Sequence, residues 1–463
     1  MKAEQNALMT QVGPQTPAGQ LLRHYWQPAA LVDEFNPALD PRMAQRPLKA
    51  VRLLGQDFVL FRDEDGRWGL LDRDCPHRGA DLAFARHEGD GIRCPFHGWK
   101  FDAEGRCLET PAEPENSTLC QRVRQRRYPV AERSGILFAW LGPQGSEPPA
   151  FPAFDCFTAP ASHTFAFKGW LDCNWLQALE VGIDPAHASY LHRYFQDESL
   201  DTSYGKQFRG ASAGSQWPMT KVLREFGRPD IHIHPTDYGM RLVALRHLDE
   251  DHTHVRVTNQ IFPQAFVIPL SADITITQWH VPVDDTHCYW YTIFTGFREP
   301  LNKEQMRQQR LALYTLPDYK PRVGRHNDWG FNPDEQRTET YTGMGQDINV
   351  HDQWAVESPG PIQDRTREHL GTSDKGIMAF RRQFLKAIET VQQGGQPPMF
   401  LSTEAAGALQ GPATVDSIAP ADGWEAHWAK VDAERRQGAP WQPRGDGAPE
   451  APGLRNDTAH SAA

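Results

Sequence analysis

The sequence lacks any uninterrupted apolar stretch long enough to cross a membrane, which takes about 20 residues. Its first residues, Met1–Asn6, also lack the apolar segment of a secretory signal. Both absences argue against a membrane-embedded or exported protein. We therefore expect a soluble protein of the cytoplasm.

A strongly basic region is also missing. The 463-residue chain has a formal net charge of -11 at pH 7, and its basic run at residues 122–127 is short. Nucleic acid binding depends on a positive surface that meets the phosphates. The sequence thus argues against a nucleic acid partner, and residues 122–127 are interpreted as a solvated strand edge or as a docking site for an acidic partner protein.

Cysteine is scarce and irregularly placed. The chain has seven cysteines, an odd number, whereas a disulfide framework uses an even number at regular spacing. Reduced thiols are therefore the expected state. Five of the seven show no regular spacing and no pairing pattern: Cys107, Cys120, Cys156, Cys173 and Cys288.

The other two cysteines each come with a histidine. Cys75 precedes His77, Cys94 precedes His97, and residues 78–93 separate the two pairs. Two thiolates on one iron and two imidazoles on the other form a Rieske [2Fe-2S] centre, although tetrahedral zinc also accepts this ligand set. A proline after each cysteine and a glycine after each histidine predict tight loops with backbone amides turned toward cluster sulfurs, which favours the iron–sulfur centre.

A second group of candidate ligands lies in residues 173–192. Glu180, Asp184 and His187 follow the spacing i, i+4, i+7 and would share one face of an ideal helix. His192 would then lie about 140° away from His187, so both can bind one metal only if a π-bulge or a break separates them. Ordinary half-buried histidines are the alternative interpretation.

The two motifs, in this order, resemble the large catalytic subunits of the Rieske non-haem iron oxygenases. That family carries C-x-H, a spacer and C-x-x-H, and later N-W-x-x-x-x-E-x-x-x-D-x-x-H-x-x-x-x-H, all of which this chain contains. The resemblance extends over about residues 10–390, and residues 360–374 are similar to the phthalate dioxygenase branch in particular. It implies a [2Fe-2S] cluster on Cys75, His77, Cys94 and His97, a mononuclear iron on His187 and His192, and a catalytic bridging role for Asp184.

A third iron ligand has to come from further along the chain, because a facial triad consists of two histidines and one carboxylate. Asp347, Asp352 and Glu357 are the candidates, and composition does not choose among them. The family's D-x-x-x-x-E pattern matches Asp352 and Glu357. The resemblance therefore implies Asp352 as the ligand.

The substrate of the phthalate-like branch is usually an aromatic acid, which a partly dry pocket would bind through arginine. Arg256 aligns best with a carboxylate-binding arginine of that branch, and a surface salt bridge is the alternative for it. Pro185 stands where the phthalate enzymes have a substrate-contacting serine, which argues against phthalate itself. Further candidates are Arg241, Arg246 and Arg224.

The function that the resemblance implies is that of an oxygenase component. It would use O2 and electrons from an NAD(P)H-dependent reductase with flavin and iron–sulfur groups to hydroxylate an aromatic substrate such as a phthalate- or benzoate-like carboxylate. O-demethylation or another monooxygenation of a methoxylated or ether-linked aromatic acid is the alternative. Family members form head-to-tail trimers, so a homotrimer or hexamer is expected. A pure electron-transfer Rieske protein and a zinc-stabilised binding protein are competing hypotheses from other classes.

The expected fold class is α+β. Residues 1–45 form a helical lead-in, and 46–150 an all-β Rieske domain, because short strands alternate there with Gly and Asp turns. Residues 160–395 form the catalytic domain, an antiparallel sheet flanked by helices. Residues 396–463 are expected to be a partly disordered extension, because they contain few large apolar residues.

Overall fold

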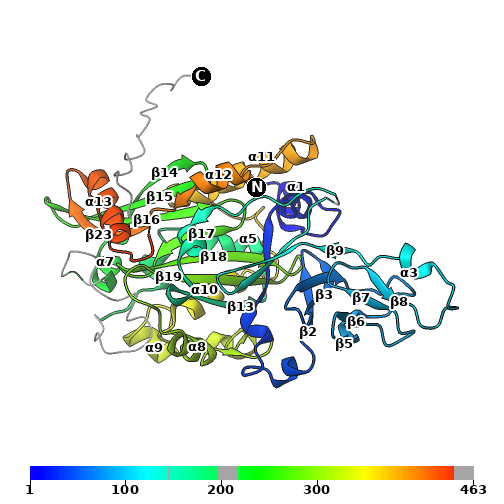
Figure 1. The fold of residues 1–463 in the computed structure, drawn as a ribbon. Coiled ribbons are helices and arrows are strands. Elements are labelled where there is room, and N and C mark those ends of the chain that lie inside the picture. The colour runs from blue at the N-terminus through cyan, green and yellow to red at the C-terminus, as the bar shows by residue number, and fades with distance from the viewer. Residues whose placement is uncertain (144, 197–216, 218, 443–463) are drawn as a thin grey trace.

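The computed structural model describes residues 1–143, 145–196, 217 and 219–442. The chain forms a small β-rich domain and a larger mixed domain, which lie at opposite ends of the view in Figure 1. The expected α+β class is confirmed. No helix in the described ranges combines the length and the apolar character that a bilayer span needs.

The N-terminal helices belong to the larger domain. Thr16 caps α2 through its Oγ1, which accepts a hydrogen bond from the Gly19 N–H at 3.2 Å, and Pro17 occupies the first helical position. Both α1 (Ala3–Thr10) and α2 (Pro17–Leu22) pack against α11 (Lys375–Gln392) near the other end of the chain. The two N-terminal helices therefore pack on a helix that lies late in the large domain.

The small domain consists of two four-stranded antiparallel sheets in the orders β2-β3-β4-β9 and β5-β6-β7-β8. It has a core of its own that includes Phe61, Trp99 and Phe101. The second sheet lies at the tip farthest from the large domain (Figure 1). The strands are β2 (Leu48–Leu53), β3 (Gln56–Arg62), β4 (Trp68–Asp72), β5 (Arg86–Glu88), β6 (Gly91–Arg93), β7 (Lys100–Asp102), β8 (Cys107–Glu109) and β9 (Arg127–Tyr128).

A third, three-stranded sheet connects the two domains. Its strands β1 (Trp26–Leu31), β11 (Ile136–Trp140) and β10 (Val130–Arg133) come from just before and just after the small domain. Strand β1 also contacts β13 and β18 of the large sheet. The small domain is thus an insertion whose two ends are tied to the core of the large one.

The large domain is built on an antiparallel sheet in the order β13-β19-β18-β17-β16-β15-β14, with β23 paired to β16. Helices α5 (Trp175–Gly182), α10 (Ile348–Glu357) and α11 pack around it (Figure 1). The strands are β13 (Thr164–Leu171), β14 (Asp230–Thr236), β15 (Gly239–His247), β16 (His252–Ile261), β17 (Ala265–Pro269), β18 (Ile274–Pro282), β19 (Cys288–Gly296) and β23 (Val415–Pro420). Further helices are α6 (Ala188–Leu191), α7 (Met219–Glu225), α8 (Lys303–Leu311), α9 (Pro333–Thr338), α12 (Thr403–Ala408) and α13 (Trp424–Gln437).

The C-terminal segment departs from its prediction. Residues 403–437 add β23 to the large sheet, and α13 covers β23, with Val415 and Ala419 buried against Trp424 and Trp428. A strand takes its hydrogen bonds from a neighbour and needs few large side chains, so the composition of this segment was misleading. The predicted disorder of residues 443–463 lies outside the described residues.

A buried carboxylate fixes α5 in the large domain. Glu180, 6% exposed, accepts hydrogen bonds from Arg381 Nε at 2.6 Å and Arg365 NH2 at 2.9 Å. Burial alone would raise the pKa of Glu180, but the two guanidinium groups lower it below its ordinary value. Arg381 also pairs with Glu368 at 2.5 Å. The network therefore joins α5 to α11 and to the loop before it.

Replacing Glu180 with Gln should lower the free energy of unfolding by about 3–5 kcal/mol, because two buried cations lose their shared counter-charge. The folded-state pKa of Glu180 is below the ordinary 4.5, so the difference from wild type should be full at neutral pH and shrink as the pH falls below that value. Urea denaturation followed by tryptophan fluorescence measures both. The exposed Glu389→Gln on the same α11 serves as control, and an equal loss there would contradict the prediction.

Candidate active site

The Cys/His pairs lie in two loops of the same construction. The first follows β4 and the second joins β6 to β7. Cys75 N–H donates to Ala80 O and Gly79 N–H to Cys75 O, both at 2.8 Å. In the second loop Cys94 N–H donates to Trp99 O at 2.8 Å and Gly98 N–H to Cys94 O at 3.0 Å. Gly79 and Gly98 have φ values of 73° and 76°, a region that favours glycine.

The four predicted cluster residues converge between these loops. The rings of His77 and His97 have centroids 4.5 Å apart, and His77 stacks on Trp99 at 4.3 Å. Cys75 and Cys94 are each 2% exposed. Burial raises the pKa of the Cys75 thiol to about 11, and the neighbouring Cys94 thiol adds to the increase. His97 Nδ1 is buried without a hydrogen-bond partner, so this set of two thiols and two imidazoles fits an iron–sulfur cluster.

The second predicted group does not lie on one helix. Helix α5 ends at Gly182, and α6 is a single turn with His187 at its N-cap and His192 at its C-cap. The prediction that Glu180, Asp184 and His187 share a helical face is wrong, because Pro185 disfavours the helical conformation at the residue before it. Arg246 of β15 supports the break, since its NH2 donates to Pro185 O at 3.1 Å. The break precedes both histidines and does not lie between them.

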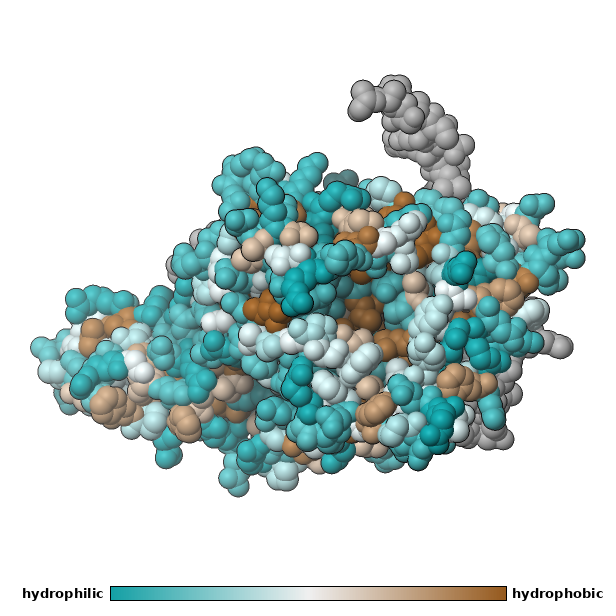
Figure 2. All heavy atoms as spheres, turned by 180° about the vertical axis from the view of Figure 1, so that it is seen from behind, coloured by the Kyte–Doolittle hydropathy of each residue, from teal (hydrophilic) through white to brown (hydrophobic). Residues whose placement is uncertain are grey.

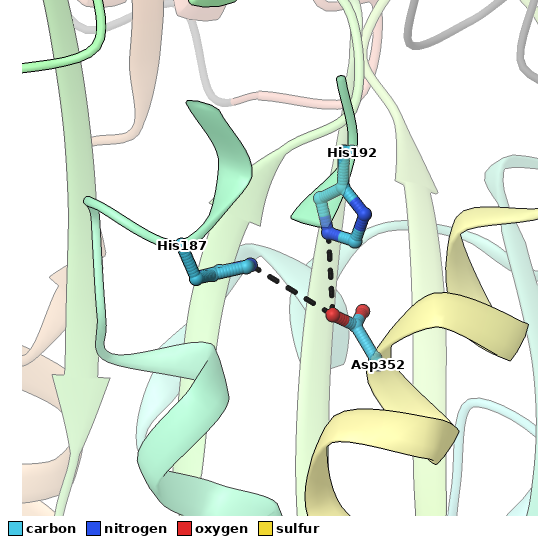
Figure 3. A group of neighbouring side chains, drawn as sticks. All are labelled: His187, His192 and Asp352. Atoms are coloured by element: carbon cyan, nitrogen blue, oxygen red, sulfur yellow. Dashed lines mark ion pairs between the residues drawn. The ribbon is translucent and has the colours of Figure 1, made fainter. Parts of the chain in front are cut away.

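His187, His192 and Asp352 come together at the end of this break (Figure 3). Asp352 lies on α10, and its Oδ1 is 3.2 Å from His192 Nε2 and 3.8 Å from His187 Nε2. That oxygen is buried, yet it makes no hydrogen bond. One ligand atom from each residue lies within 4.8 Å of the others. Two imidazoles and a carboxylate whose buried oxygen has no hydrogen bond form a ligand set that suits a metal such as iron.

The other two candidate carboxylates are engaged elsewhere. Asp347 caps α10, where its Oδ1 accepts from the Asn349 N–H at 2.8 Å. Glu357 accepts hydrogen bonds from Trp329 Nε1 at 2.7 Å and from the Asp172 N–H at 3.0 Å. Of the three, Asp352 is the one that meets the histidines.

Hydrogen bonds set the tautomers of both histidines. His187 Nδ1–H donates to the carbonyl of Asp184 at 2.5 Å. His351 Nε2–H donates to Gly345 O at 2.9 Å, which leaves His351 Nδ1 to accept from His192 Nδ1–H at 3.4 Å. Burial lowers the pKa of His187 and so favours its neutral form. Both imidazoles therefore present an Nε2 lone pair toward Asp352, as metal ligands require.

Asp184 occupies the break itself. Its Oδ1 accepts a hydrogen bond from the Ala186 N–H at 2.8 Å, and its backbone carbonyl holds His187. The side chain thus caps the turn around Pro185 and also lines the cavity described next. A link from Asp184 to a cluster histidine of another subunit stays a prediction.

A cavity of about 180 Å³ opens beside the three candidate ligands. Its wall is mainly apolar and includes Val181, Phe266, Ile276 and Trp290. Its polar members beyond the ligands and Asp184 include Arg256, Thr258, Gln278, His280 and Asn349. A mainly apolar cavity beside two imidazoles and a carboxylate that could hold a metal is a setting in which an enzyme can direct oxidation at one atom of a bound molecule.

Sequence reasoning missed two of these polar side chains. Gln278 and His280 are two residues apart on β18, so their side chains lie on the same face of the strand. Gln278 Nε2 lies 3.1 Å from His280 Nε2, within hydrogen-bond distance. Burial lowers the pKa of His280 to about 3, so its imidazole is neutral. Ile276, Gln278 and His280 lie on one face of β18, and two polar side chains on a mostly buried strand are a signal that this face has a function. The pattern does not say which part of the structure that face lines.

The four predicted arginines differ in position. Arg256 lines the cavity, and its guanidinium is ion-paired to Asp416 of β23. The others are absent from the described cavity wall. Arg246 holds the break, Arg241 lies over the ring of Trp428, and Arg224 donates to Tyr194 O.

Comparison with known families agrees with this division of the chain. Residues 33–129 match the Rieske [2Fe-2S] domain, and residues 139–436 match the family described as LigXa C-terminal domain like. The second match alone covers more than half of the chain.

Named relatives extend over most of the sequence. The chain is 33% identical to the phthalate 4,5-dioxygenase oxygenase subunit of Pseudomonas putida, covering 84% of this chain and 87% of the relative. It is also 33% identical to the 5,5'-dehydrodivanillate O-demethylase oxygenase subunit of Sphingobium sp., covering 88% and 84%. The solved structure of dicamba monooxygenase bound to dicamba has the same fold, with a TM-score of 0.54 at 18% identity, covering 80% of this chain and 98% of that one.

Replacing His187 or His192 with Ala should remove the mononuclear iron and leave the iron–sulfur chromophore intact, because the two sites use separate residues in separate domains. Elemental analysis should fall from about three irons per chain to about two. The exposed His369→Ala serves as control. Three irons retained in both variants would rule out these ligands.

Proposed function

Because the chain belongs to the Rieske non-haem iron oxygenases, we propose that it is the oxygenase component of a multicomponent system that hydroxylates an aromatic substrate. Electrons come from a separate reductase that oxidises NAD(P)H, and a cytoplasmic location follows from that supply. The observation that carries the proposal is the meeting of His187, His192 and Asp352 at the wall of an apolar cavity.

The residues divide into those that would hold the two metal centres and those that would contact the substrate. We assign the [2Fe-2S] cluster to Cys75, His77, Cys94 and His97, and the mononuclear iron to His187, His192 and Asp352. When bound, the cluster transfers single electrons and the iron activates O2. The Asp184 carbonyl and His351 orient the two imidazoles. The apolar wall excludes water, and Arg256 is the proposed contact for a polar substituent of the substrate.

O-demethylation is the alternative reaction within the same family. It uses the same ligands and differs in which atom of the substrate the cavity presents. The relative that is named as an O-demethylase oxygenase subunit supports keeping this alternative. Aromatic acids and their uncharged derivatives, ring-hydroxylated or demethylated, are the substrate classes to test.

A homotrimer or hexamer would bring the two centres together between subunits. Within one chain, the sheet β5–β8 and helix α10 belong to different domains (Figure 1). Phe96, within the second cysteine–histidine loop, is 56% exposed. Tyr190 and Tyr341, in a groove that reaches His187, are 48% and 45% exposed. Seen from behind, apolar surface gathers in a hollow of the larger domain and recurs on the smaller one (Figure 2). Exposed apolar patches of this kind support a head-to-tail assembly, which would bury them between copies.

The proposed reaction is tested by a product screen with a compatible reductase. Benzoate, the phthalate isomers, phenoxybenzoates, methoxylated aromatic acids and the corresponding amides are supplied with O2 and NAD(P)H. We expect a hydroxylated product, or formaldehyde from a methoxylated compound, and no product from the His192→Ala variant. Release of peroxide without product for every compound would show that the substrate belongs to another class.

Asp184→Asn should keep both metals and lose coupled turnover. Asp184 already holds His187 through its backbone carbonyl, and its Oδ1 accepts from the Ala186 N–H. The second carboxylate oxygen can accept a hydrogen bond from a cluster imidazole of a neighbouring subunit, whereas Asn has only one accepting oxygen for both partners. Iron content, the visible spectrum and the ratio of product to NAD(P)H consumed measure this effect. Asp251→Asn, at an exposed carboxylate, is the control. Normal coupling in Asp184→Asn would refute a bridging role.

A further inference from the structure

The cavity arginine has a counter-charge on the neighbouring strand. Arg256 of β16 stands directly opposite Asp416 of β23 in the antiparallel register. Its NH1 forms an ion pair with Asp416 Oδ2, and NH2 reaches Pro269 O at 3.4 Å. The Arg256 side chain is 22% exposed and that of Asp416 is 12% exposed. The ion pair is therefore largely buried within the sheet and has little contact with bulk water.

Asp416 stays ionised in this position. Its Oδ1 accepts a hydrogen bond from His254 Nε2 at 3.0 Å. Burial alone would raise the pKa of Asp416, but His254 and Arg256 lower it to about 2. His254 is fully buried, and burial lowers its own pKa, so its imidazole is neutral at pH 7. The group of Arg256, Asp416 and His254 thus has a net charge of zero.

The other described residues of the cavity wall provide no second positive charge that could balance an anionic substrate. Thr258, Gln278, His280 and Asn349 are uncharged. A divalent iron held by Asp352 would leave one positive charge, which the carboxylate of Asp184 on the same cavity wall would offset. A substrate carboxylate beside Arg256 would therefore add an unbalanced negative charge close to Asp416 in a partly dry cavity. An uncharged oxygen can still accept a hydrogen bond from Arg256, because a guanidinium has five N–H donors.

We propose that Asp416, acting through Arg256, makes the cavity select uncharged aromatic substrates, such as amides, esters or ethers, over aromatic carboxylates. The inference rests on the proposed function, since it requires this cavity to be the substrate site. It assigns a specificity role to a residue in the C-terminal segment, far from both metal motifs in the sequence.

The experiment compares the binding of 4-methoxybenzamide and 4-methoxybenzoate to the anaerobic holoenzyme by calorimetry. The wild type should bind the amide at least about tenfold more tightly, since an uncompensated charge costs at least one tenfold step in Kd. Asp416→Asn keeps the shape and frees the charge of Arg256, so it should tighten benzoate binding about tenfold. Its affinity for the amide should change little. Glu250→Gln, an exposed position before β16, is the control.

A double variant shows whether the gain comes through Arg256. Arg256→Gln combined with Asp416→Asn should lose the new benzoate affinity, because the cation that Asp416→Asn releases is then absent. A general loosening of the fold would not tighten the binding of one ligand and leave that of the other unchanged. If Asp416→Asn does not fold, the wild-type preference and the single Arg256→Gln variant, which should weaken the amide alone, decide the question.

Two results overturn the inference. One is a wild type that binds the carboxylate as tightly as the amide. The other is an Asp416→Asn variant without a gain in benzoate binding, including the case in which neither protein binds it at millimolar concentration. Failure of the proposed function is seen separately, as absence of product and of the mononuclear iron from the purified protein.

Discussion

The ion pairs of Glu180 with Arg365 and Arg381 fix the geometry on which the candidate iron site depends. They hold α5 against α11, and α5 ends only a few residues before Asp184 and His187. The same helix end packs so closely on β17 that a Cβ at Gly182 would lie 2.0 Å from the ring of Phe266. The end of α5 is thus packed tightly against the sheet, and the break around Pro185 brings His187 to the cavity wall.

The sheet completes the site from the other side. Arg246 of β15 binds the carbonyl of Pro185, Arg256 of β16 lines the cavity, and Asp416 of β23 neutralises Arg256. Adjacent strands thus hold the break and set the charge of the cavity wall. Because β23 comes from the last part of the chain, the cavity acquires its charge balance only when the C-terminal segment joins the sheet.

The sequence predicted the parts of the site whose residues lie close together in the chain. Cys75 and His77, and Cys94 and His97, had to be close in sequence because a tight loop carries each pair, so their spacing was informative. The relation of Glu180 to His187 was wrong, because helical periodicity ignores the effect of Pro185 on the residue before it. Asp416 could not be found at all. Its role depends on which strand pairs with β16, and that is decided by tertiary packing rather than by local pattern.

The two candidate iron-binding histidines are held in different ways, and this difference has a mechanical consequence. His192 is oriented by another side chain, His351, whereas His187 is oriented by the main chain of Asp184. Any contact that displaces Asp184 must therefore also turn the ring of His187. A neighbouring subunit or a substrate that moved the main chain at Asp184 would act on the ring of His187, whereas His192 is held by a residue of α10. The break between α5 and α6 is thus the point at which a contact outside the cavity can reach one of the two candidate histidines.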